Sequence, residues 1–188
     1  LLDYTITQIP TELQEQTIVT TDDEEIIKKL INSKIKILKR DEKLCLDETS
    51  TKEVILNVIE EFNIKKDSTI ILLYLTEPNR KFSDVKKIFS YYKMKDATTL
   101  TCCVEPKSHP FLCLYKIDDE KGEQIVKHDL YRRQDYPECI EIRHFVCIFK
   151  VDEINNLNQN LYNEKTIYYK IDDDDIDVDY ETDFEKFK

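Results

Sequence analysis

Apolar and polar residues follow two different periods along the first half of the chain. Runs rich in β-branched residues occur at 16–21, 34–38 and 68–75, with another at 96–105. The run at 68–75, STIILLYL, is continuously apolar, which is typical of a strand buried on both faces. Between the runs, apolar residues recur at helical spacing, over DDEEIIKKLIN, TSTKEVILNVIEEF and FSDVKKIFSYYKM. Strand and helix thus alternate, which predicts an α/β fold with a parallel sheet covered by helices on both sides.

The pattern changes in the second half of the chain. The segment PFLCLYKIDDEKGEQIVKH predicts an antiparallel hairpin that turns between Asp118 and Gly122. Further strands are expected at 139–150 and 165–171, and a short helix at 180–187. No repeat or long linker interrupts this order.

We therefore expect one domain over residues 1–188, with the hairpin as an extension over 108–135. The first residues, LLDYTITQI, have the pattern of a helix already in progress. Since they also lack a methionine, we expect a piece of the protein to be missing in front of Leu1.

Composition narrows the class of protein. A chain of 188 residues with 40% hydrophobic content can bury the core of a globular domain. With 39 acidic against 28 basic residues, the net charge of −11 argues against wrapping by nucleic acid or docking on anionic lipid. No apolar run approaches a membrane span and no signal-peptide pattern opens the chain, so we expect a cytoplasmic protein. The six cysteines form no C-x-x-C pair and are expected to be buried thiols.

Ligands of open parallel sheets gather beyond the carboxyl ends of the strands. The loops that begin at Thr20, Lys39, Thr76 and Val104 are therefore the candidate site. Near Thr20, the hydroxyl and carboxylate groups of TTDD are by themselves best interpreted as helix caps. The single glycine, Gly122, excludes a glycine-rich phosphate loop within these residues.

Arginines mark two of the loops. In LTEPNR, the segment that leaves the apolar strand, Arg80 could meet an anion at the ligand edge, but a surface salt bridge is an equal alternative. In YRRQDYPE, at 131–138, two adjacent arginines precede a glutamine and an aspartate, a set suited to pairing with carboxylate or phosphate. A charged surface loop is the alternative interpretation for the second motif.

An acidic run lies near the end of the chain. The carboxylates at 172–175 are best interpreted as solvated, whereas Asp177 and Asp179 alternate with Ile176 and Val178. If this alternation forms a buried strand end, both carboxylates point into one cavity and could hold a metal ion. The residues by themselves leave a solvated tail and a metal site both open.

Taken in order, these segments resemble the acylneuraminate cytidylyltransferase family, the CMP-sialic acid synthetases and their relatives for other nonulosonic acids. The resemblance covers almost the whole chain, and RRQD and IDVD are its most specific pieces. It implies a three-layer, Rossmann-like nucleotidyltransferase domain with a mostly parallel sheet. Such domains bind CTP and a nine-carbon acidic sugar, whose anomeric hydroxyl attacks the α-phosphate and releases pyrophosphate. The other segments that carry the resemblance are IVTTDDEEI, LKRDEKLCLDETSTKEVILNVIE, ILLYLTEPNRKFSDV and SHPFLCLYKIDDEKG.

The resemblance also assigns roles to individual residues. It implies Asp177 and Asp179 as Mg²⁺ ligands and, together with Arg80, as catalytic residues. Residues on the CTP side would be Asp22, Arg40, Thr49 and Thr51. Residues on the side of the acidic sugar would be Thr76, Arg133, Gln134 and Asp135. A homodimer is expected, with the segment after SHPF reaching the partner subunit.

Three features depart from the family pattern. The first strand and the glycine-rich loop of the family would lie upstream of Leu1. The segment YLTEPNR, at 74–80, stands where relatives have roughly Q-P-T-S-P-L-R, so that Glu77 faces a site for anions. Arg143-His144-Phe145 stands where relatives have Asn-Gly-Ala. These departures support a second hypothesis, a non-catalytic relative that keeps the fold for binding or assembly.

Overall fold

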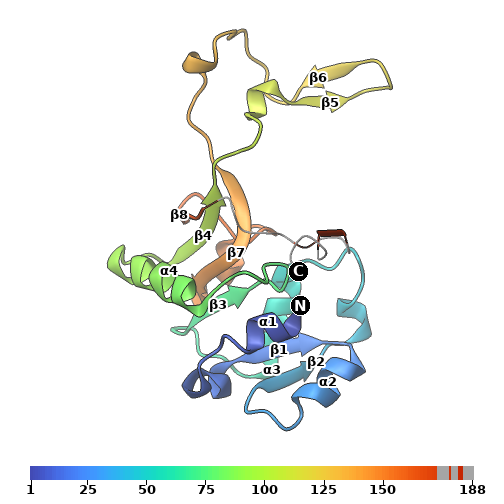
Figure 1. Ribbon diagram of the computed structural model, residues 1–188, viewed down its shortest axis with the longest axis vertical. Coiled ribbons are helices and arrows are strands. Elements are labelled where there is room, and N and C mark those ends of the chain that lie inside the picture. Colours follow the sequence, from blue (N-terminus) through green and yellow to red (C-terminus); the bar gives the residue numbers. More distant parts are fainter. Residues whose placement is uncertain (173–177, 179–181, 184–188) are drawn as a thin grey trace.

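A computed structural model describes residues 1–172, 178 and 182–183 of the chain. The described strands form a parallel pair β1–β2, a four-stranded sheet in the order β3-β7-β4-β8, and an antiparallel hairpin β5–β6. Figure 1 shows the first two sheets and the helices α1 to α4 in one body, from which an arm that carries β5 and β6 projects. None of the helices in this described part is long and apolar enough to cross a membrane.

The parallel pair lies at the start of the body. β1 (Ile18–Thr21) pairs with β2 (Lys36–Lys39), and the carboxylate of Asp23 caps α2 (Glu24–Leu30) between them by accepting the backbone N–H groups of Glu25 and Ile26. After β2, a capping box of Ser50 and Glu53 begins α3 (Thr51–Glu61). Shorter helices precede these elements or lie between them: α1 (Leu2–Ile6), η1 (Thr11–Gln16) and η2 (Glu42–Leu44).

The four-stranded sheet is mixed. It contains β3 (Thr69–Leu73), β4 (Thr99–Val104), β7 (Glu141–Lys150) and β8 (Ile167–Lys170). β7 lies antiparallel between β3 and β4, while β8 is parallel to β4. The predicted α/β fold is confirmed. The strands before residue 105 were expected to pair in parallel with one another, but β3 and β4 do not pair because β7 lies between them. The apolar segment FVCIF of β7 takes the central place because it can be buried on both faces.

Alternate side chains of β7 build the two halves of the core. Val146 and Ile148 contact a cluster that includes residues of α4 (Phe82–Met94), whereas Cys147 and Phe149 contact a cluster with Ile55 of α3. The second cluster also includes residues of η5 (Val151–Asn156) and the segment after it. Helices therefore cover both faces of this sheet, as the three-layer prediction required.

The strand β3 differs from its prediction. STIILLYL was expected to be buried on both faces, but Ile71 is 36% exposed and β7 is the one strand that pairs with β3 among the described residues. The strand buried throughout is β4, which lies between β7 and β8. The prediction was wrong because continuous apolarity does not distinguish an edge strand, partly covered by helices, from a central one.

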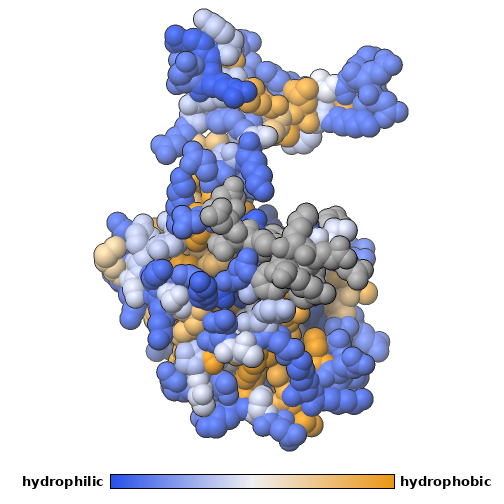
Figure 2. Space-filling view, viewed as in Figure 1, coloured by the Kyte–Doolittle hydropathy of each residue, from blue (hydrophilic) through white to orange (hydrophobic). Residues whose placement is uncertain are grey.

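The arm comprises the residues between β4 and β7, at 105–140. It contains η3 (Pro110–Leu112), β5 (Leu114–Lys116), β6 (Gly122–Gln124) and η4 (Arg133–Asp135). The predicted hairpin is confirmed, and the Asp118 carboxylate accepts two backbone N–H groups within its turn. Hydrophobic residues gather on the side of the arm seen in Figure 2. The helix expected at 180–187 lies outside the described residues except for positions 182 and 183.

Candidate functional site

The carboxyl ends of β1 and β2 bring Thr20 and Arg40 together. The Arg40 guanidinium donates to the carbonyl oxygen of Thr20 at 3.0 Å, and its backbone N–H donates to Thr21 at 2.9 Å. The Thr20 hydroxyl and the Arg40 Nε are buried and have no hydrogen-bond partner in the described part of the chain. Buried polar atoms are normally paired, so two unpaired atoms at a ligand edge indicate groups that a bound molecule can satisfy.

Asp22 lies in the same place, beside Cys45. The pKa of the Cys45 thiol is raised, chiefly by partial burial and then by the Asp22 carboxylate, while Arg40 acts in the opposite direction. Asp23, and not Asp22, caps the following helix. The sequence interpretation of TTDD as a capping segment therefore holds for Asp23, and the Asp22 carboxylate lies at the candidate site.

Thr49 and Thr51 flank the cap of α3. The Thr49 hydroxyl donates to the carbonyl oxygen of Lys43 at 3.4 Å, within the loop that connects β2 to α3, and Thr51 is the exposed first residue of the helix. This loop starts at Arg40, so both threonines belong to the same side of the site. Their expected contact with the nucleotide stays a prediction.

The β3 loop, residues 74–80, lies at the carboxyl end of β3. The carbonyl oxygen of Thr76 accepts the backbone N–H of Val178 at 2.8 Å, and Val178 is buried. Asp177 and Asp179, the predicted Mg²⁺ ligands, lie outside the described residues. The residue between them, Val178, is thus docked on the β3 loop, and the alternation expected for IDVD stays a prediction.

Arg80 lies inside the protein. Its side chain is 4% exposed, and its guanidinium donates to the carbonyl oxygen of Phe145 at 2.6 Å and to the Thr5 hydroxyl at 3.4 Å. The guanidinium also lies 5.7 Å from the centre of the Phe145 ring. In this arrangement Arg80 holds the β3 loop against β7 and α1, and its expected catalytic role stays a prediction.

Glu77 and Arg143, which the sequence suggested as two separate departures, form one ion pair. The Arg143 Nε lies 2.6 Å from a carboxylate oxygen of Glu77, whose side chain is fully buried. Next to this pair, the exposed His144 stacks on Tyr74 with ring centres 4.8 Å apart. Sequence reasoning missed the pairing because 66 positions separate the two charges.

The RRQD motif lies on the arm. Arg133, Gln134 and Asp135 form the exposed helix η4, and Arg132 donates two hydrogen bonds to the Asp135 carboxylate, at 2.7 and 2.8 Å. The Arg133 side chain has no hydrogen bond or ion pair with the described residues. Figure 1 shows this end of the arm held away from the strand ends of its own chain. Among the described residues of one chain, the motif does not meet the rest of the candidate site.

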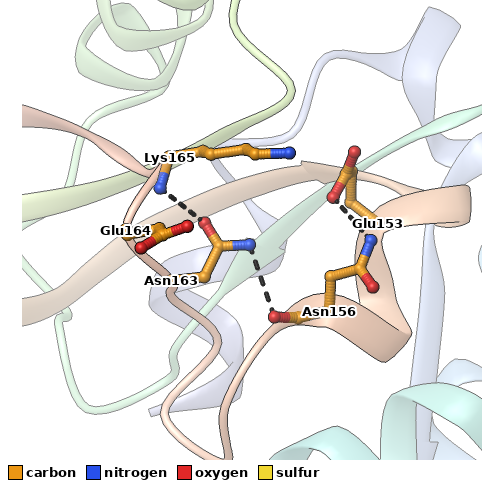
Figure 3. Close-up of a pocket in the computed structure, with 5 residues that line it drawn as sticks. All are labelled: Glu153, Asn156, Asn163, Glu164 and Lys165. Carbon is orange, nitrogen blue, oxygen red and sulfur yellow. Dashed lines mark hydrogen bonds between the residues drawn. The ribbon is translucent and has the colours of Figure 1, made fainter.

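A surface hollow of about 480 Å³ lies at the opposite edge of the sheet. It is lined by side chains that follow β7 and precede β8, and Figure 3 shows that several of them bond one another. Asn163, for example, donates to the carbonyl oxygen of Asn156 and accepts the backbone N–H of Lys165. Because these groups are already paired, the hollow is a less suitable site than the carboxyl ends of the strands.

The described residues contain no group of three or more His, Cys, Asp or Glu side chains that could hold a metal ion. All six cysteines are free, and Cys102, Cys103 and Cys147 are buried, as expected, whereas the other three are partly exposed. Burial raises the pKa of both Cys102 and Cys147 to about 12, so these thiols are structural and not nucleophiles.

Comparison with known proteins adds to this geometry. No protein-family model matches the chain. The solved structure of a CMP:2-keto-3-deoxy-manno-octonic acid synthetase, complexed with CTP, matches with a TM-score of 0.57 over 90% of this chain and 78% of that chain. The chain shares this fold. At 14% sequence identity, the likeness extends to the fold and not further.

One curated relative matches in sequence. Post-translational flagellin modification protein B of Campylobacter coli is 25% identical over 191 residues, which span 98% of this chain and 80% of that protein. Together the two matches show the fold of this chain and one relative of it in sequence. They do not single out the acylneuraminate branch that the motifs resemble.

Proposed function

We propose that this chain transfers CMP from CTP to an acidic sugar and releases pyrophosphate. The observation that carries the proposal is the pair of buried, unpaired polar atoms on Thr20 and Arg40, at the carboxyl ends of the parallel strands. The Arg40 guanidinium is a donor suited to a carbonyl or phosphate oxygen, and the threonine hydroxyl can donate or accept. The structural likeness to a synthetase that was solved with CTP supports this assignment.

The acceptor would be an acidic sugar, and we favour a nine-carbon one because RRQD and IDVD resemble the family that uses such acids. Thr76 would lie on the sugar side, since the β3 loop follows the next strand along the chain after β1 and β2. The sugar's anomeric hydroxyl would attack the α-phosphate, and positioning both substrates would provide most of the rate acceleration.

Asp177 and Asp179 would hold Mg²⁺. Two carboxylates are the oxygen donors that this ion prefers, and they flank Val178, which is buried and bonded to Thr76. When bound, the ion neutralises charge that develops on the phosphate oxygens. In this proposal the chain would present both carboxylates near the carboxyl end of β3, where Val178 is docked.

A homodimer would complete the site. Several large hydrophobic side chains of the arm are exposed, among them Leu114, Tyr115 and Ile117 at 58%, 62% and 63%. An apolar surface on a projecting arm favours a partner of matching shape, and a second copy of the chain provides one. Arg133 and Gln134 could then meet the sugar acid bound to the partner subunit, because they lie away from the strand ends of their own chain.

Two measurements test the proposal. Calorimetric titration with CTP and Mg²⁺ should give binding at micromolar CTP, and Arg40→Met should weaken it about tenfold to a hundredfold. Lys34→Met, at an exposed pair with Glu15, is the matched control and should bind as wild type. Pyrophosphate release should then appear with CTP, Mg²⁺ and either N-acetylneuraminate or 2-keto-3-deoxy-manno-octonate.

The second candidate is a binding or assembly module without transferase activity. Arg80 is buried and Arg143 is paired with Glu77. Both arginines are therefore engaged within the protein and not with an anionic substrate, which favours this candidate. CTP binding without pyrophosphate release from a folded protein would support this candidate. Absence of CTP binding would contradict a nucleotide role altogether.

A further inference from the structure

Three consecutive residues of β7 contact the β3 loop. Arg143 pairs with Glu77, His144 stacks on Tyr74, and the carbonyl oxygen of Phe145 accepts from Arg80. The regular pairing of β3 with β7 ends at Leu73 and Val146. Side chains therefore continue the contact between the strand and the loop beyond the backbone ladder.

The pairing of β4 with β7 shifts its register next to the residues of β7 that contact the β3 loop. Thr101 of β4 pairs with Cys147, whereas Cys102, the next residue, pairs with Arg143. His144, Phe145 and Val146 thus lie between two consecutive partners of β4. Irregularities of this kind bend a strand and redirect its side chains, and they are frequent beside functional sites.

The ion pair is placed where its loss would move the β3 loop. The Glu77 side chain is fully buried, while the Arg143 side chain keeps 16% of its surface exposed, so the charge of Glu77 is compensated inside the protein. Thr76, the adjacent residue, accepts the backbone N–H of Val178. The charge pair and the docking point of Val178 are therefore neighbours along the chain.

We infer that Glu77 and Arg143 are positioning residues, which fix the β3 loop so that Thr76 faces the sugar acid and Val178 stays docked. This inference rests on the proposed function for its effect on catalysis. It assigns the two departures from the family pattern one joint role in holding the sugar side of the site. It also predicts that the two residues depend on each other for stability, so that exchange of Arg143 alone lowers the unfolding temperature whereas exchange of both does not.

Four variants separate positioning from simple stability. Glu77→Gln and Arg143→Met each remove one charge, and Arg143→Met leaves the other charge buried, so this variant should unfold at a lower temperature. The double variant Glu77→Met/Arg143→Met replaces the pair by apolar side chains of similar length and should keep the unfolding temperature of wild type. Lys170→Met is the matched control, because its pair with Glu105 also measures 2.6 Å but is exposed.

Two readouts follow, of which one does not depend on turnover. In the double variant, exchange of the Val178 amide hydrogen should accelerate at least about tenfold, because the hydrogen bond to Thr76 opens more often. The KM for the sugar acid should rise about tenfold to a hundredfold, with the CTP affinity unchanged. Lys170→Met should alter none of these quantities.

A double variant that exchanges Val178 at the wild-type rate and keeps the wild-type sugar KM would overturn the inference. If wild type turns over neither N-acetylneuraminate nor 2-keto-3-deoxy-manno-octonate, the proposed transferase function fails. The Val178 exchange rate still decides whether the ion pair positions the segment, since it is measured without substrate. The two failures are therefore distinguishable.

Discussion

The position of RRQD on the arm leads to a quantitative test of a shared site. Arg40 belongs to the body and Gln134 to the arm, so a site built by two subunits takes one residue from each chain. We consider the variants Arg40→Met and Gln134→Ala, each of which would remove the hydrogen bonds to substrate that we propose and should lower activity about tenfold to a hundredfold. Each variant alone affects every site of its homodimer.

Mixing the two variants should restore activity. If equal amounts exchange subunits at random, half of the dimers are hybrids, and each hybrid has one site with an intact body and an intact arm. About a quarter of all sites, and hence about 25% of wild-type activity, should return. This recovery exceeds the activity of either parent by about 2.5-fold to 25-fold.

The assay is pyrophosphate release after co-refolding of two differently tagged variants. Tandem purification through both tags isolates the hybrid and should double the recovered activity to about half of wild type. The purified hybrid of Arg40→Met with Lys127→Met, a control on the arm whose pair with Glu123 is exposed, should likewise have about half of wild-type activity because both of its arms keep Gln134. Purified hybrids that stay at the activity of the parents would refute the shared site.

Other predictions concern stability, thiols, pH and metal. Phe149→Ala should lower the free energy of unfolding in urea by about 3–5 kcal/mol, because the ring is fully buried in the cluster beside α3. Cys102 and Cys147, with thiol pKa values of about 12, should resist iodoacetamide at pH 8 until the protein unfolds, and modification of the native protein at the rate of a free thiol would contradict this. Hydrogen bonds to Ser50 in the capping box lower the pKa of Glu53 below 4.5. The stabilisation by the Glu53 carboxylate is therefore complete above that pH and is lost as the pH falls through the folded-state pKa. Glu53→Gln should flatten this part of the curve of unfolding free energy against pH. Asp177→Ala should abolish Mg²⁺-dependent pyrophosphate release, and a wild-type rate would show that the metal assignment is wrong.

The secondary structure elements could be predicted because their signals are local. The capping box at Ser50 and Glu53, the apolar spacing of α4 and the turn at Asp118 each depend on residues within one or two turns of chain. The candidate edge was also predictable, since the end of each strand is marked by where its apolar run stops. The loops that begin at Thr20, Lys39 and Thr76 were located on that basis, whereas Arg40 itself was assigned by the family resemblance.

The tertiary structure decided how the strands pair and how the charges combine. Which strand is central depends on the register between segments far apart in sequence, so β7 could take the place between β3 and β4 without a local signal. The partner of Glu77 was hidden for the same reason, because a buried charge selects its counterion by distance in space. The sequence by itself thus determined the helices and strands and the polar residues at the strand ends. Only the fold determined that Arg143 pairs with Glu77 and that Gln134 lies on the arm, away from both.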